Sequence, residues 1–462
     1  MTDTWSAFLA GTFTERLRMV GDDRHAAELR ERLGPDAFAQ YQGFAAGLDE
    51  GHLGDVATNL VFVPGVMGSL LSSDGYGGVW WLDIRSRNHI NDLRLAPGGR
   101  GDADPRARIK PFAVDLSYEG FFAGVHATTT LRHEAFAYDW RKSLAESTGR
   151  FAERVTRISD DLGGRPVHVV AHSMGGLMVR TALAAHPQLW SRIDRIVFVG
   201  TPHYGAPVIA GYLKNHLWGW DALALLGRYL DRDTFRSLWG VLGLLPAPAG
   251  VYPGTRDAAD HPCANFDLYD ASAWHLGLDL EAEHRLQGAL DAARAQHEEL
   301  YRAHLDLDQE RRDRMAVIAG VGYRTLFRTA YKPAFGFGWE HMDRVTSRRP
   351  GDPHRDGDGR VPLASARLEY VAETRYVRGE HGRLPSIPAV YDDAFRFLAG
   401  KPMQLPRTPQ EALAGHLGGD GTADAADGDD PGYLDLSAPD LDALDEALEN
   451  GRFPSFRQVR LL

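Results

Sequence analysis

The sequence predicts a three-layer α/β fold, in which a mostly parallel β-sheet is covered by helices on both faces. Short, nearly continuous apolar runs that are rich in β-branched residues recur along the chain. Segments with helical spacing of apolar residues separate these runs. Strands that are buried on both faces have this character, and helices are the usual connections between parallel strands.

Six strands are expected in chain order, and three helices are expected between or after them. An interval rich in Trp and Leu, followed by a Pro-rich turn and a long charged helix, breaks the alternation before the fifth strand. Because an insertion at this place lies over the carboxyl edge of the sheet, we interpret it as a helical cap or lid. The expected strands are 59–65, 134–139, 166–172, 192–200, 315–322 and 374–378, and the expected helices are 143–161, the segment after Ser173, and 387–398, with the long charged helix at 281–304.

Four parts are predicted along the 462 residues. Amphipathic helical patterns open the chain, and a Gly-, Asp- and Ala-rich stretch near its end is typical of a solvated linker. Either terminal part is a candidate surface for a protein partner. The parts are an N-terminal helical extension (1–55), an α/β core (56–200 and 315–402), the cap (201–314) and an acidic, partly disordered tail (403–462).

Charge and cysteine content exclude several classes of protein. Eleven acids and no Lys or Arg lie between Asp420 and Glu449, so most of the formal charge of −12 belongs to the tail and the rest of the chain is nearly neutral. No basic face for nucleic acid is indicated. One cysteine, Cys263, permits neither an internal disulfide nor a cysteine metal cluster. The opening residues lack a basic leader and no apolar run would span a membrane, so we expect a cytoplasmic protein.

The segment from Pro166 to Gly176 carries the strongest chemical signal. An apolar strand runs into Ser173, and Gly175 and Gly176 leave room for a sharp turn into a helix. Such an elbow exposes a nucleophilic hydroxyl above the carboxyl edge of a sheet and places a helix N-terminus beneath it. Ala171 stands where glycine is usual, a mild departure. The competing interpretation is a serine that only caps a buried helix.

The other groups that a nucleophilic serine needs follow in the chain. A turn-rich loop after the fifth strand contains Asp356 and Asp358, and His381 lies in a glycine-flanked loop after the sixth. The order Ser, Asp, His is that of the α/β-hydrolases. Either aspartate could reach the histidine from such a loop. The N–H groups of Met67, in the glycine loop after the first strand, and of Met174 are the expected oxyanion donors.

Other interpretations of these residues have weaker support. Asp352, His354 and Asp356 imitate the start of a calcium-binding loop, but Leu363 stands where the last carboxylate should be, so no metal or cofactor is expected. His172 should point away from the serine and pack or form a hydrogen bond. Five tryptophans are candidates for substrate contact, although packing of the cap or core explains each equally well: Trp80, Trp81, Trp218, Trp220 and Trp239.

Taken together, these motifs resemble the lecithin:cholesterol acyltransferase-like branch of the α/β-hydrolases, which includes lysosomal phospholipases. By this resemblance Ser173 is the nucleophile, His381 the base, and Asp358 rather than Asp356 its orienting group. The resemblance lies between residue 59 and about residue 385. The pieces that carry it are Val61–Ser69, Trp80–Asp83, Tyr138–Arg141, Ala171–Gly176, Val199–Ala206, Phe235–Leu238, Asp356–Pro362 and His381.

The sequence therefore predicts a serine hydrolase or acyltransferase for carboxylic esters, with lipid esters as the leading substrate class. The tryptophans and the cap would cover an acyl chain or touch a membrane surface. A small-ester esterase, thioesterase or amidase would use the same groups. A non-catalytic α/β scaffold that recruits partners through its ends is the alternative from another class.

Overall fold

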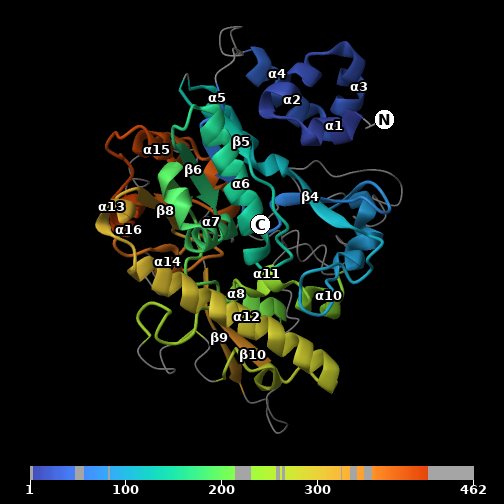
Figure 1. Cartoon of the computed structure of the whole chain (residues 1–462), viewed down its shortest axis with the longest axis vertical. Coiled ribbons are helices and arrows are strands. Elements are labelled where there is room, and N and C mark those ends of the chain that lie inside the picture. Colours follow the sequence, from blue (N-terminus) through green and yellow to red (C-terminus); the bar gives the residue numbers. More distant parts are fainter. Residues whose placement is uncertain are drawn as a thin grey trace.

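The computed structural model contains a six-stranded sheet in which every pair of neighbouring strands is parallel (Figure 1). It describes residues 4–46, 57–81, 84–128, 130–213, 230–255, 261–262, 266–323, 325–332, 341–347 and 356–414, without the side chains of 84–88, 327–332 and 341–347. The strand order is β11-β8-β7-β6-β1-β5. The strands are β1 Leu60–Val63, β5 His133–Ala135, β6 Val167–His172, β7 Ile193–Val199, β8 Met315–Val321 and β11 Glu373–Arg378.

Apolar side chains of this sheet contribute to two separate hydrophobic cores, one on each face. In β1, Val61 and Val63 belong to one core, and Leu60 and Phe62 to the other. Alternate residues of a strand point to opposite faces, so a strand covered on both sides must be apolar throughout. Helices α6 Ala145–Asp161 and α7 Met174–Ala185 cover the first face, and α5 Glu119–His126 and α15 Pro388–Leu398 cover the second. The predicted three-layer α/β architecture is confirmed.

Two antiparallel units accompany the parallel sheet, and the sequence analysis missed both. Strands β2 Ser69–Ser73, β3 Val79–Trp81 and β4 Ile109–Val114 form a small sheet in the order β3-β2-β4. Strands β9 Thr325–Lys332 and β10 His341–Ser347 form a hairpin. The strand predicted at 134–139 is shorter than expected, because its second half turns to donate the Tyr138 N–H to the Ser69 hydroxyl.

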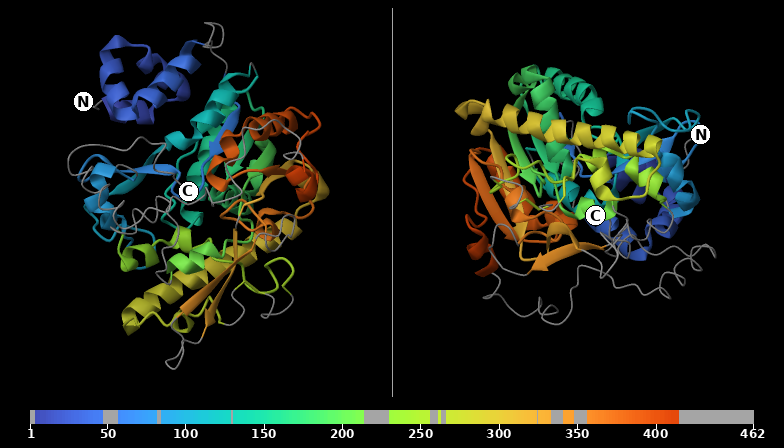
Figure 2. Two further views of the ribbon diagram at one scale, coloured as in Figure 1. Left: turned by 180° about the vertical axis from the view of Figure 1, so that it is seen from behind. Right: turned by 90° about the horizontal axis from the view of Figure 1, so that it is seen from below.

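Within the interval predicted as a cap, the structure describes short helices and one long one. Helix α12 Leu280–Leu305 runs along the side of the molecule away from the N-terminal helices (Figure 2). Its buried positions, among them Leu286, Leu290 and Leu300, pack into the same core as α7. The shorter elements are α8 Val208–Leu213, α10 Arg232–Arg236, α11 Trp239–Leu242 and the 3-10 helix η6 Ala271–Trp274.

Four helices form the N-terminal extension and pack on the core. Their apolar residues join the core that also contains Phe62 and Phe121. Arg16 and Glu119 form an ion pair at 2.8 Å whose side chains are only 5% and 10% exposed. The helices are α1 Thr4–Ala10, α2 Phe13–Val20, α3 Asp23–Leu33 and α4 Pro35–Ala46.

Short helices connect the remaining elements. The connecting helices are η2 Ile84–Leu93, η3 Leu116–Tyr118, η4 Pro187–Ser191, α13 Gln309–Arg312, α14 Leu363–Ala366, η7 His381–Ser386 and α16 Pro409–Ala414.

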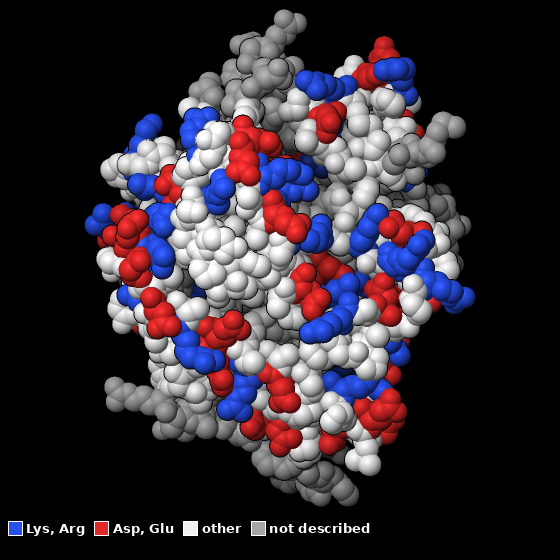
Figure 3. Space-filling view, in the orientation of Figure 1, with Lys and Arg blue, Asp and Glu red and all other residues white. Residues whose placement is uncertain are grey.

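No helix among the described residues is long and apolar enough to cross a membrane. On the face drawn in Figure 3, acidic and basic side chains are interspersed over the described surface. The predicted acidic tail lies outside the described residues from 415 onward.

Candidate active site

Ser173 lies at a sharp turn between β6 and α7. Its φ of 52° and ψ of −129° are unusual for a residue with a side chain, as in a nucleophile elbow. A Cβ on Gly175 would lie 2.5 Å from the carbonyl oxygens of Val63 and Pro64, so only glycine fits this close approach. The Ser173 side chain makes no capping hydrogen bond to α7. The interpretation of Ser173 as a helix cap is therefore wrong.

His381 connects Ser173 to Asp358. Its Nε2 lies 2.9 Å from Ser173 Oγ, and its Nδ1 lies 2.7 Å from Asp358 Oδ2. The Asp358 carboxylate is fully buried and accepts two backbone N–H groups through Oδ1, from Arg360 at 3.0 Å and Val361 at 2.7 Å. An ionised carboxylate holds the proton on Nδ1 and leaves the Nε2 lone pair facing the hydroxyl. The structure thus brings together the three residues singled out in the sequence.

Asp356 has a different environment. Its Oδ1 accepts the backbone N–H groups of Gly322 and Gly357, each at 2.8 Å. These bonds shape the loop that carries Asp358, and the carboxylate hydrogen-bonded to His381 Nδ1 is that of Asp358. Asp352 and His354, the other members of the calcium-loop pattern, lie outside the described residues. Among the described residues, no group of three or more His, Cys, Asp or Glu side chains could hold a metal ion.

Two backbone N–H groups are available beside the serine. Met67 follows β1 with a φ of 61°, and Met174 is the first residue of α7, where the helix leaves its N–H groups unpaired. Within the described part of the chain, neither N–H donates to a protein acceptor. A Cβ on Gly65 would lie 2.9 Å from Ser173 Cβ, so this glycine lets the Met67 loop approach the elbow. Both predicted oxyanion donors thus come from segments next to Ser173.

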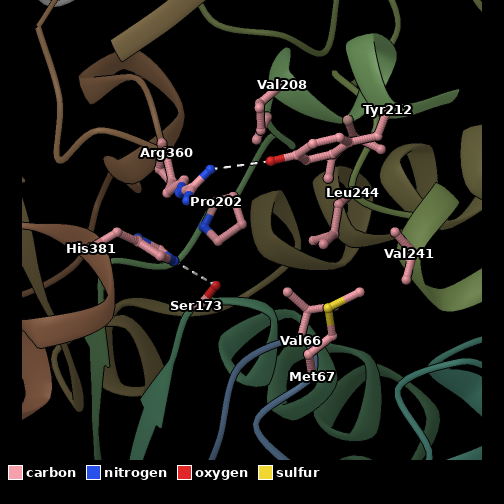
Figure 4. Close-up of a pocket in the computed structure, with 13 residues that line it drawn as sticks. Val66, Met67, Ser173, Pro202, Val208, Tyr212, Val241, Leu244, Arg360 and His381 are labelled. Atoms are coloured by element: carbon pink, nitrogen blue, oxygen red, sulfur yellow. Dashed lines mark hydrogen bonds between the residues drawn. The ribbon is translucent and has the colours of Figure 1, made fainter. Parts of the chain in front are cut away.

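An apolar pocket of about 40 Å³ opens beside Ser173 and His381 (Figure 4). Arg360 contributes the charged group of its rim and donates from Nη1 to the Tyr212 hydroxyl at 3.1 Å. Neither residue was singled out in the sequence, although Arg360 lies only two positions after Asp358. The remaining lining residues are Val66, Met67, Pro202, Ala206, Val208, Ile209, Val241, Leu244 and Val361.

Of the five tryptophans predicted to contact substrate, the three in the described part of the chain, Trp80, Trp81 and Trp239, are not among the residues that line this pocket. The Trp81 indole N–H donates to the Met67 carbonyl at 2.8 Å, and the Trp80 indole N–H donates to the Gly77 carbonyl at 3.0 Å. Trp239 packs at the start of α11, where a Cβ on Gly99 would come within 2.4 Å of its ring. Trp80 and Trp81 thus pack within the small antiparallel sheet, and Trp239 packs between α11 and Gly99. Trp218 and Trp220 lie outside the described residues.

His172 is buried behind the serine and forms two hydrogen bonds, as expected of a packed histidine. Its Nδ1 lies 2.9 Å from the Tyr118 hydroxyl, and its Nε2 lies 3.1 Å from the His381 carbonyl oxygen. Burial holds the pKa of His172 well below its usual value, and the neighbouring His381 lowers it further. Tyr118 was not foreseen, since it lies in a helical segment with no recognisable motif.

Known proteins resemble this chain over limited parts of its length. The family model of lecithin:cholesterol acyltransferase matches residues 123–215, which include Ser173. Lecithin-cholesterol acyltransferase-like 4 of Arabidopsis thaliana is 27% identical over 120 residues, 25% of this chain and 21% of that protein. Phospholipase A(1) LCAT3 of Arabidopsis thaliana is 44% identical over 46 residues, 10% of each chain. The chain therefore spans about a fifth and a tenth of the length of these relatives.

Similarity to solved structures extends further along the chain at lower identity. The Tle4-Tli4 complex is similar over 75% of this chain and 97% of the compared chain, with 14% identity and a TM-score of 0.46. The family match covers β6, the elbow and α7, which are the segments that build the site. Around the elbow the chain is therefore similar in sequence to the lecithin:cholesterol acyltransferase family.

Proposed function

We propose that this protein is a serine hydrolase or acyltransferase for carboxylic esters, and that Ser173 is its nucleophile. One observation carries the proposal: hydrogen bonds run without a break from Asp358 through His381 to Ser173, at 2.7 and 2.9 Å. Serine is a weak nucleophile on its own and needs a base oriented by a third group. The buried positions of all three side chains also exclude water that would compete for these bonds.

The geometry supports acyl transfer in two steps. As the Ser173 oxygen bonds to the ester carbonyl carbon, His381 Nε2 takes the hydroxyl proton, and the Asp358 carboxylate stabilises the resulting imidazolium. The carbonyl oxygen becomes an oxyanion and accepts the N–H groups of Met67 and Met174. Collapse expels the alcohol, which takes the proton from His381, and leaves an acyl-enzyme. Water or a second alcohol then repeats the sequence and releases the acyl group.

The pocket supports an ester with an apolar acyl part. Its lining consists mostly of Val, Leu, Ile, Met, Ala and Pro side chains, which favour hydrocarbon over polar groups. We therefore place lipid esters first among the substrates. A cap over the carboxyl edge of the sheet would also meet a lipid surface when substrate is drawn from a membrane.

Labelling with a fluorophosphonate tests the nucleophile. The wild-type protein should be labelled at one serine, and Ser173→Ala should abolish labelling and lower turnover by roughly 10⁴-fold or more. Ser147→Ala is the matched control, because it removes another buried hydroxyl from a helix outside the pocket lining. Full labelling of the Ser173→Ala protein would refute the assignment.

A substrate screen then tests the lipid class. p-Nitrophenyl esters of increasing chain length should be hydrolysed beside phospholipid vesicles and acylglycerols, with thioester and amide analogues included. Activity that rises with acyl length and extends to vesicles supports lipid esters. Activity confined to the shortest esters, or to thioesters or amides, would remove lipid esters and leave the nucleophile assignment in place.

A further inference from the structure

Behind the Ser173 elbow, four buried groups are joined by three hydrogen bonds. The Gly65 N–H donates to the Tyr118 hydroxyl oxygen at 2.9 Å, that hydroxyl contacts His172 Nδ1 at 2.9 Å, and His172 Nε2 contacts the His381 carbonyl at 3.1 Å. Tyr118, His172 and His381 are each 5% exposed or less. These hydrogen bonds therefore join the Met67 loop to the loop that carries the proposed base, without contact with bulk water.

The direction of every bond in this chain is fixed by chemistry. A carbonyl oxygen can only accept, so His172 must carry its proton on Nε2 to bond the His381 carbonyl. Burial holds the pKa of His172 well below its usual value and favours the neutral ring, so Nδ1 is an acceptor and the Tyr118 hydroxyl must be the donor to it. The Tyr118 oxygen remains free to accept the Gly65 N–H. Changing any one member therefore leaves a buried polar group of its neighbour unsatisfied.

Tyr118 also limits the shape of the Met67 loop. A Cβ on Gly68 would lie 2.8 Å from the Tyr118 hydroxyl oxygen, so the loop rests directly on this side chain. Met67 lies between the two glycines that touch Tyr118, and it has a φ of 61°. A residue in this uncommon conformation keeps it only when its surroundings hold it there.

His381 is held by its backbone from two sides. Its N–H donates to the Asp358 carbonyl at 2.9 Å, and its carbonyl accepts from His172. The two imidazole rings lie 5.0 Å apart. Since burial keeps His172 neutral, it places no positive charge against the imidazolium that forms on His381 during the proposed reaction.

We propose that Tyr118 and His172 are positioning residues. They hold the Met67 loop and the loop that carries His381 in fixed positions relative to each other around Ser173. The proposal rests on the function proposed above. Neither side chain lines the described pocket, so both act through Met67 and His381 rather than on the substrate. Their loss should lower the rate of the chemical step and leave substrate binding nearly unchanged.

Tyr118→Phe and His172→Phe are the variants that test this role. Each should lower kcat by about 10-fold to 100-fold, as expected when reacting groups are misplaced by up to roughly 1 Å, with KM changed by less than about twofold. Because the two residues act in one chain, the double variant should lose little more than the worse single variant. Tyr138→Phe is the matched control: it removes a buried hydroxyl with no hydrogen-bond partner among the described residues, and kcat should stay near the wild-type value.

The kinetics are measured on full-length protein at a temperature where melting curves show each variant folded. Values of kcat within twofold of Tyr138→Phe in both single variants, or losses that multiply in the double variant, would overturn the positioning role. If Tyr118→Phe does not fold, His172→Phe carries the test alone. Ser173→Ala separates the two proposals: activity in that variant contradicts the proposed function, whereas an inactive Ser173→Ala with a normal His172→Phe contradicts positioning only.

Discussion

Asp358→Asn is the substitution with the most sharply defined consequence in this site. The aspartate offers Oδ2 to His381 Nδ1 and Oδ1 to the N–H groups of Arg360 and Val361. An asparagine has one acceptor oxygen, so it cannot serve both sides. If that oxygen faces the two backbone donors, the amide N–H₂ faces His381 and forces its proton onto Nε2, where the ring can no longer act as a base.

The opposite orientation of the asparagine would preserve the correct histidine tautomer at the expense of the loop. Its N–H₂ would then face two buried backbone donors, and each unsatisfied donor costs about 1–3 kcal/mol, so about 2–6 kcal/mol in total. At about 1.36 kcal/mol per tenfold change, the competent form would be about 30-fold to about 3 × 10⁴-fold less populated. We expect kcat for a short p-nitrophenyl ester to fall by a factor in this range.

Asp356→Asn is the matched comparison for this experiment. Its Oδ1 accepts two backbone N–H groups, and asparagine keeps an oxygen for them. We expect kcat to remain within about threefold of the wild-type value, since the two backbone bonds are kept and the hydrogen bond to His381 comes from Asp358. An active Asp358→Asn protein beside an inactive Asp356→Asn protein would refute the argument and give the orienting role to Asp356.

Three further predictions concern the elbow, the N-terminal helices and the pocket. Gly175→Ala should destabilise the protein by about 1–3 kcal/mol, because its Cβ would meet two carbonyl oxygens at 2.5 Å. Gly149→Ala should stabilise the protein by about 0.5–1 kcal/mol, because a Cβ there would lie in open space on helix α6. Urea unfolding midpoints that shift in the same direction in both variants would contradict this. Glu119→Gln should cost about 3–5 kcal/mol, measured in the same way, because it leaves the Arg16 cation buried without its partner. Leu244→Ala should enlarge the pocket and raise kcat/KM for longer p-nitrophenyl esters relative to the acetate, and an unchanged chain-length preference would show that this wall does not meet the acyl group.

The parallel strands could be predicted because their sequences must be apolar on both faces. Strands β6 and β8 were found on this basis, close to their observed bounds. The antiparallel sheet was not predicted because β2 and β3 are short, and because Trp80 and Trp81 were candidates for substrate contact. Only the fold shows that their indole N–H groups are used by backbone carbonyls.

Those residues of the candidate site that lie after the ends of strands could be predicted from the sequence. Ser173, Asp358 and His381 each follow a core strand in the order expected of the fold, so their meeting at one edge of the sheet could be anticipated. Tyr118 could not be found in this way. It enters the site from a helix on the far face, and its role depends on a distance to His172 that no spacing in the sequence encodes.

The sequence predicts the N-terminal helices as a separate part of the chain and a candidate surface for a protein partner, because ester hydrolysis does not require them. The structure gives them a different relation to the core. Phe13 and Arg16 of α2 contact His126 and Glu119 of α5, the helix that begins directly after Tyr118. Deleting residues 1–46 would strip apolar cover from this face and leave Glu119 without its cation. Loss of partner binding after such a deletion would therefore not distinguish a docking surface from a damaged core, whereas exchange of exposed charges on α3 would.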